Sequence, residues 1–139
     1  MVVSYHEIEV NTKGEVDMVD ITTDIIQCIK KSGVNEGIVN ICNPGSTGSL
    51  TTIEYEPGLQ KDFPRFFERI APKQIKYEHH KTWNDDNGHS HVRASLMGPS
   101  ITMPVHKGKL VHGTWQQIVF VEFDTTPRKR HIIISIIGK

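Results

Sequence analysis

Four of the eight histidines lie close together, in the stretch that begins at His79 and ends at His91. Two aspartates, Asp85 and Asp86, stand between the two pairs of histidines. Imidazole and carboxylate groups are natural ligands of Zn²⁺ and related divalent ions. The cluster therefore predicts a metal site, with the ion, Zn or Mg, left open. The alternative is a polar surface loop whose histidines are only solvated.

The spacing of the last two histidines limits which of them can share an ion. His89 and His91 are two residues apart, and a helix is expected over residues 90–97, ended by Gly98. On a helix, residues two apart point about 160° away from each other, whereas in an extended strand they share a face. One of the two is therefore expected to be a bystander, and neither is expected in the core.

A second candidate site is the loop of small residues at positions 44–49. Its backbone amides and the hydroxyls of Ser46 and Thr47 could cradle a phosphate or a carboxylate, although glycine and serine also make simple tight connections. Basic side chains could bind phosphate as well. Arg93 lies beside the histidine cluster, and Arg128, Lys129 and Arg130 form a basic run in an expected hairpin turn, where basic groups are often just solvated.

The elements that must position these residues follow from hydrophobic periodicity and turn signals. We expect a helix over residues 21–32, capped by Asp20 and ended by Gly33, and a second helix up to Ile70, capped by Asp62, with Pro64 in its first turn. Residues 74–87 are expected to form a surface loop. Strands are expected over residues 3–10, 15–19, 37–42, 50–55, 100–105, 116–123 and 131–137, the last three as an antiparallel meander.

Composition and charge narrow the classes of protein. A chain of 139 residues has the usual size of one domain, so residues 1–139 are expected to form a single unit. Sixteen basic residues balance sixteen acidic ones, which argues against a nucleic-acid or anionic-membrane partner. Because the sequence has neither a signal-peptide pattern nor a run of about 18 apolar residues, a cytoplasmic protein is predicted.

The last expected strand, residues 131–137, carries five isoleucines. It is too apolar on both faces for a strand that meets water on one side. It should therefore be central in its sheet or lie in a subunit interface, and this favours a homo-oligomer.

The sequence resembles the YjbQ-like family, also called the secondary thiamine-phosphate synthase family, over most of its length. The resemblance is strongest from residue 91 to residue 116, and it also includes the triplet of residues 77–79, the strand with Glu54, and residues 122–128. The residues that carry the strongest part are His91, Val92, Arg93, Ala94, Ser95, Leu96, Gly98, Ser100, Pro104, Gly108, Leu110, Gly113, Thr114, Trp115 and Gln116.

The resemblance implies an α+β fold: a single domain with a folded mixed or antiparallel β-sheet, pseudo-barrel or sandwich-like, and two to three helices. It implies a homotrimer or a multiple of one, often with a metal ion on histidines. It also implies weak thiamine-phosphate synthase activity, which joins a hydroxymethylpyrimidine diphosphate to a thiazole phosphate. The corresponding ligand is a small phosphorylated metabolite.

Roles for individual residues follow from this resemblance. His79 and His91 are expected to hold the metal, and Glu54 or Asp86 to act as acid, base or support. The expected phosphate-binding residues are Ser46, Thr47, Arg93 and Arg128, and further candidates are Thr114 and Gln116.

One departure from the family pattern concerns the metal. Many members carry histidine directly after the proline of the small-residue loop, where this chain has Gly45. Either the metal site of His79 and His91 is completed by Asp86, Glu54, water or a neighbouring subunit, or anion binding in the loop has replaced metal binding. Two alternative functions use the same residues: a metal-dependent hydrolase, in which a carboxylate takes a proton from metal-bound water, and a non-catalytic oligomeric module that binds a small anionic metabolite.

Overall fold

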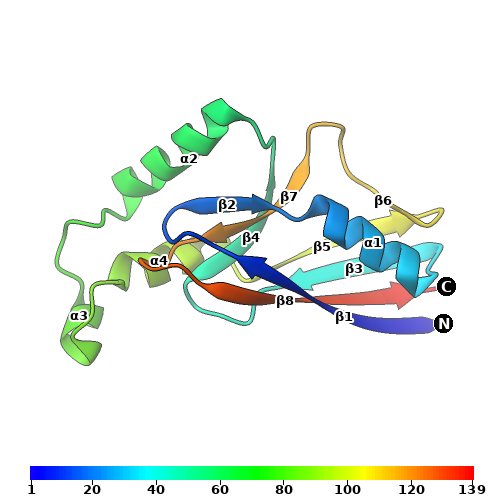
Figure 1. Ribbon diagram of the computed structural model, residues 1–139, viewed down its shortest axis with the longest axis horizontal. Coiled ribbons are helices and arrows are strands. Elements are labelled where there is room, and N and C mark those ends of the chain that lie inside the picture. Colours follow the sequence, from blue (N-terminus) through cyan, green and yellow to red (C-terminus); the bar gives the residue numbers. More distant parts are fainter.

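Eight β-strands form two antiparallel sheets that pack face to face (Figure 1). The computed structural model describes residues 1–139. The larger sheet has the order β1-β8-β3-β5-β6 and the smaller one the order β2-β7-β4. The strands are β1 (Val2–Asn11), β2 (Asp17–Asp20), β3 (Glu36–Cys42), β4 (Gly48–Ile53), β5 (Ser100–His106), β6 (Lys109–Leu110), β7 (Gln117–Glu122) and β8 (Lys129–Gly138).

Four helices accompany the sheets, and none is long and apolar enough to cross a membrane. The chain termini lie together at one end of the molecule, and α3 projects at the opposite end (Figure 1). The helices are α1 (Thr22–Ser32), α2 (Pro57–Ile70), α3 (Glu78–Trp83) and α4 (Gly88–Met97). The α+β class and the sandwich-like antiparallel sheets agree with the prediction, but the number of helices exceeds the two to three expected.

Strand β7 is the centre of the packing because it is buried on both faces. Ile118 and Phe120 face the larger sheet and α1 in the main core. Val119 and Val121 face the opposite way, into a second core that includes residues of α2 and α4. Residues of both faces are inaccessible to water. The smaller sheet is therefore a middle layer, and its end carries polar groups into the interior between the sheets.

Helix α1 matches its prediction closely. Gly33 ends it in the left-handed conformation, with φ of 71°. Asp20 stands one residue before the N-cap position, and its carboxylate accepts hydrogen bonds from the amide (2.9 Å) and the hydroxyl (2.6 Å) of Thr22.

The predicted start of α2 was wrong. The helix begins at Pro57, and the side chain of Glu56, not Asp62, accepts the amides of Gly58 and Leu59. Pro64 lies inside the helix rather than in its first turn. A proline at the first helical position followed a strong capping carboxylate, and together they outweighed the cost of the internal proline.

The predicted meander was also wrong. Strand β5 pairs with β3 and β6, β8 pairs with β1 and β3, and β7 belongs to the other sheet. The apolar residues on both faces of β7 require a position between two layers. The segment predicted as the surface loop, residues 74–87, contains α3, and α4 begins at Gly88, so His89 and His91 are both helical.

Candidate functional site

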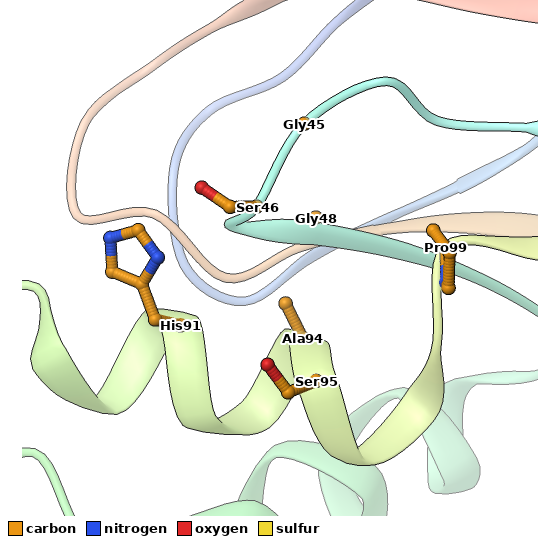
Figure 2. Close-up of a pocket in the computed structure, with 7 residues that line it drawn as sticks. All are labelled: Gly45, Ser46, Gly48, His91, Ala94, Ser95 and Pro99. Atoms are coloured by element: carbon orange, nitrogen blue, oxygen red, sulfur yellow. The ribbon is translucent and has the colours of Figure 1, made fainter.

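An open pocket of about 210 Å³ lies between the small-residue loop and α4. Figure 2 shows the imidazole of His91 rising from α4 toward Ser46 of the loop. Ser95 lies one helical turn further along the same helix. The complete lining is Gly45, Ser46, Gly48, His91, Ala94, Ser95 and Pro99. The loop and the strongest stretch of the family motif thus meet at one site.

The loop is fixed from inside by Asn43, which is buried. Its amide nitrogen donates to the carbonyls of Gly45 (3.3 Å) and Gly48 (3.1 Å). Gly48 must lack a side chain because a Cβ there would lie 2.4 Å from the ring of Phe120. The short residues of this loop therefore allow close approach to the core, and they also hold Ser46 at the pocket.

The two histidines assigned to a metal come together from different helices. The ring centroids of His79 on α3 and His91 on α4 are 4.4 Å apart. Nε2 of His79 lies 3.1 Å from Oδ1 of Asn87 and 3.4 Å from Oδ1 of Asp85. Since α4 begins at Gly88, the predicted geometry is confirmed: His91 faces this cluster, and His89 does not.

Asp124, just after β7, joins the histidines to the loop. Its Oδ2 accepts hydrogen bonds from Thr47 (3.0 Å) and Arg128 (2.6 Å). Its Oδ1 lies 3.5 Å from the amide nitrogen of Asn87, which contacts His79 in turn. Thr47 and Arg128, both predicted to bind phosphate, are therefore held at this site by Asp124.

The electrostatics favour a neutral imidazole at His91. Burial lowers its pKa, and the neighbouring His79 lowers it further, against the opposing effect of the carboxylates of Asp124 and Asp85. Burial acts to raise the pKa of Asp124, but hydrogen bonds from Thr125, Thr47 and Arg128 bring it below the usual value. A neutral imidazole near the ionised carboxylate of Asp124 suits a bound cation.

His89 is buried, contrary to the expectation that neither histidine would lie in the core. Its side chain is inaccessible to water, and Nε2 lies 2.5 Å from Oε2 of Glu15. Glu15 also pairs with Lys73, and the ring of Tyr77 lies 6.3 Å from that of His89. Helix α4 packs between the pocket and the turn before β2. The side of the helix opposite His91, where His89 lies, therefore faces the protein interior.

Three predicted site residues lie at the other end of the smaller sheet. Glu54 follows the end of β4, whereas the pocket lies at its start, so the two are roughly 20 Å apart along the strand. Thr114 and Gln116 precede β7, and Gln116 donates to Thr52 (3.0 Å). Within one chain the structure does not bring these residues to His91.

Two further predicted residues also lie away from the pocket. Asp86 borders a separate cavity of about 350 Å³ with Lys73, Lys76 and His80. Arg93 is buried, and it donates to the carbonyl of Ala71 (3.0 Å) and the carboxylate of Glu68 (2.8 Å). These contacts hold the guanidinium of Arg93 between α4 and the end of α2.

The sequence interpretation gave no role to Asn87 or Asp124. Asp124 lay within the stretch 122–128 that resembles the family, and it forms an acidic pair with Glu122 at the end of an otherwise apolar strand. Arg130 was one of three basic turn residues that could bind phosphate, without a reason to prefer it. Nothing in the sequence marked Asn87, whose role comes from the turn between α3 and α4.

The side chains present fit a metal ion in part. No group of three or more His, Cys, Asp or Glu residues is arranged to hold an ion as the side chains stand. Two imidazoles are in place, and Asp85 is the adjacent carboxylate, half exposed at 41% and without a basic partner other than His79.

The fold and this site define a small α+β domain with an open pocket between the small-residue loop and His91 of α4. The family model described as UPF0047 protein YjbQ-like matches residues 6–139. A UPF0047 protein of Archaeoglobus fulgidus is 36% identical over 129 residues, which are 93% of this chain and 98% of that protein. The chain belongs to the UPF0047, or YjbQ-like, family.

Solved structures agree with this assignment. A YbjQ-like protein of Sulfolobus solfataricus superposes with a TM-score of 0.93 at 36% identity, over 99% of this chain and 98% of that one. A yjbq/upf0047 family protein of Clostridium acetobutylicum gives a TM-score of 0.87 at 34% identity, over 95% of this chain and 99% of that one. The sheets that position the pocket are thus common to these relatives.

Proposed function

We propose that this protein binds a divalent metal ion between His79 and His91 and a small phosphorylated metabolite in the adjoining pocket. The observation that carries the proposal is the pairing of these imidazoles, 4.4 Å apart, beside a loop with a free serine hydroxyl. Asp85 is the proposed third ligand. The identity of the metal, Zn or Mg, is set by the completed ligand set.

The size and chemistry of the pocket support a phosphate group as the part of the ligand that enters. At about 210 Å³, the pocket is smaller than the roughly 300–1,000 Å³ that holds a whole drug-sized ligand. Ser46 and Ser95 supply hydroxyls to phosphate oxygens. The hydroxyl of Thr47 is already engaged, so Thr47 positions the loop instead of contacting the ligand.

The proposed reaction is transfer of the thiamine-phosphate synthase type, for which the family resemblance is the support. When bound, the ion would neutralise charge on a departing diphosphate. His91, kept neutral by its surroundings, holds that ion without releasing a proton, and Asp124 fixes the loop that orients the phosphate. A cytosolic location is part of this proposal.

A turnover assay tests the reaction. The purified protein is incubated with hydroxymethylpyrimidine diphosphate, thiazole phosphate and Mg²⁺ or Zn²⁺, and thiamine phosphate is measured by chromatography. We expect metal-dependent formation of the joined product, abolished by chelator. Release of phosphate without joining would contradict synthase activity in favour of the hydrolase. Binding without any turnover would favour the non-catalytic module.

We also propose that the outer face of the larger sheet is covered in a homotrimer or a multiple of one. Val3, Ile137 and Ile38 lie side by side on β1, β8 and β3, and their side chains are 76%, 40% and 45% exposed. Such a contiguous apolar row on an open sheet is characteristic of an interface. Although β8 is central, as predicted, only its inner isoleucines are fully buried.

Light scattering at micromolar concentration tests the assembly. We expect a mass of three times the 15.8 kDa of one chain, or a multiple of that value. Replacing Ile38 by lysine should shift the mass toward the monomer by placing a charge in the row. A parent mass of one chain would contradict the proposal.

A further inference from the structure

We propose that Arg130 is the residue that binds the anionic group of the ligand, through its Nη1 atom beside Gly45. This deepens the proposed function, and it rests on the pocket being a phosphate site. From the sequence, this role was expected of Arg93 and Arg128. Arg93 is held by the carbonyl of Ala71 and the carboxylate of Glu68. Arg128 pairs with Asp124 through Nη2 alone, and its side chain is 49% exposed, so it is not fixed in place as Arg130 is.

Arg130 lies at the point where the two sheets meet. It is the first inward-facing residue of β8, and Glu122 is the last inward-facing residue of β7. Nε of Arg130 donates to Oε1 of Glu122 (3.0 Å), and Nη2 donates to Oε2. Nη2 also donates to the hydroxyl of Thr47 (2.9 Å). The guanidinium carbon is 5.7 Å from the centre of the Phe120 ring.

These contacts use only three of the five N–H groups of the guanidinium. Nη1 makes no hydrogen bond and is not fully buried, so it reaches solvent. The Glu122 carboxylate is inaccessible to water and accepts further hydrogen bonds from Thr12 (2.7 Å) and the amide of Asp124 (3.3 Å). The guanidinium is therefore rigidly held, with one nitrogen left free for a ligand.

Gly45 explains how that nitrogen stays uncovered. A Cβ on Gly45 would lie 3.0 Å from Nη1, and Gly45 itself lines the pocket. Its backbone is not in the positive-φ region, so conformation does not require glycine there. The missing side chain leaves Nη1 uncovered beside Gly45, which lines the pocket together with Ser46 and His91. An oxyanion of the phosphate class matches these donors.

Binding of inorganic phosphate tests this assignment, measured by ³¹P NMR titration in the presence of chelator so that metal binding cannot contribute. Arg130→Lys keeps a positive charge for Glu122 but has no second nitrogen to present. We expect it to weaken phosphate binding by at least about 10-fold, the effect of losing one hydrogen bond to a charged group. Lys129→Gln is the matched control, because Lys129 faces outward toward Glu9 (3.4 Å), and it should change binding less than about 2-fold.

Gly45→Ala tests the same contact without altering the buried ion pair, and it remains decisive if Arg130→Lys fails to fold. Its methyl group should cover Nη1 and weaken phosphate binding by at least about 3-fold, with the melting temperature preserved. Parent-like affinity in Gly45→Ala and Arg130→Lys would overturn the assignment, as would an equal loss in Lys129→Gln. No phosphate binding by the parent would also overturn it. Failure of metal binding alone would leave this titration unaffected, so the two proposals fail separately.

Discussion

Replacing His91 by alanine is expected to weaken Zn²⁺ binding by at least about 10- to 100-fold, the loss typical even of residues that only support a ligand. His91 is the imidazole that faces both His79 and the pocket, and its lowered pKa keeps it ready to coordinate at neutral pH. Titration of metal-free protein against a zinc-binding dye measures the affinity directly.

The matched control is His80→Ala, which removes a histidine of the same cluster. His80 borders the other cavity, and its Nε2 accepts the amide of Gly88 at 3.3 Å. Its loss should change Zn²⁺ affinity less than about 3-fold, far below the effect at a ligand. Equal losses in the two variants, or unchanged affinity in His91→Ala, would remove the site as described.

Replacing His89 by alanine is expected to lower the free energy of unfolding by about 2–4 kcal/mol. The change leaves a cavity under α4 and removes a hydrogen bond to the partly buried carboxylate of Glu15. Metal binding should stay within a few-fold of the parent because His89 faces away from His91. Urea denaturation in the presence of chelator measures the loss. A decrease below about 0.5 kcal/mol would place His89 among ordinary surface residues.

The pH dependence of the free energy of unfolding in Glu15→Gln isolates the contribution of the Glu15 charge, because this substitution does not create the cavity that His89→Ala leaves. Burial acts to raise the pKa of Glu15, but hydrogen bonds from Lys73 and His89 outweigh it and lower the pKa below the usual 4.5. The ionised carboxylate therefore stabilises the folded state above that value. This contribution is lost as the pH falls through the lowered pKa of the folded protein, so parent and variant should converge in stability only in acid.

Local sequence patterns correctly predicted the parts of the fold that depend on a single local interaction. Gly33 and Gly98 end their helices as expected, because glycine allows backbone conformations that other residues avoid. The apolar alternation of β1 and the isoleucines of β8 correctly predicted strands. His91 was placed at the site by the combination of helical spacing and the family motif.

The pairing of strands distant in the chain could not be predicted from the sequence. The order of β5, β7 and β8 depends on which apolar faces find each other across the core, and local turn signals do not encode this choice. The burial of His89 depended on a partner 74 residues away. Arg130 was likewise ambiguous, since only contact with Glu122 distinguishes an anchored guanidinium from a solvated turn residue.

X-ray diffraction at the zinc absorption edge, from crystals grown with Zn²⁺ and inorganic phosphate, would locate both proposed ligands at once. We expect one anomalous peak within about 2.0–2.1 Å of an imidazole nitrogen of both His79 and His91. We also expect a phosphate in the adjoining pocket, between Ser46 and Nη1 of Arg130. A zinc peak at His80 and Asp86 instead, or no ordered zinc at all, would contradict the proposed metal site.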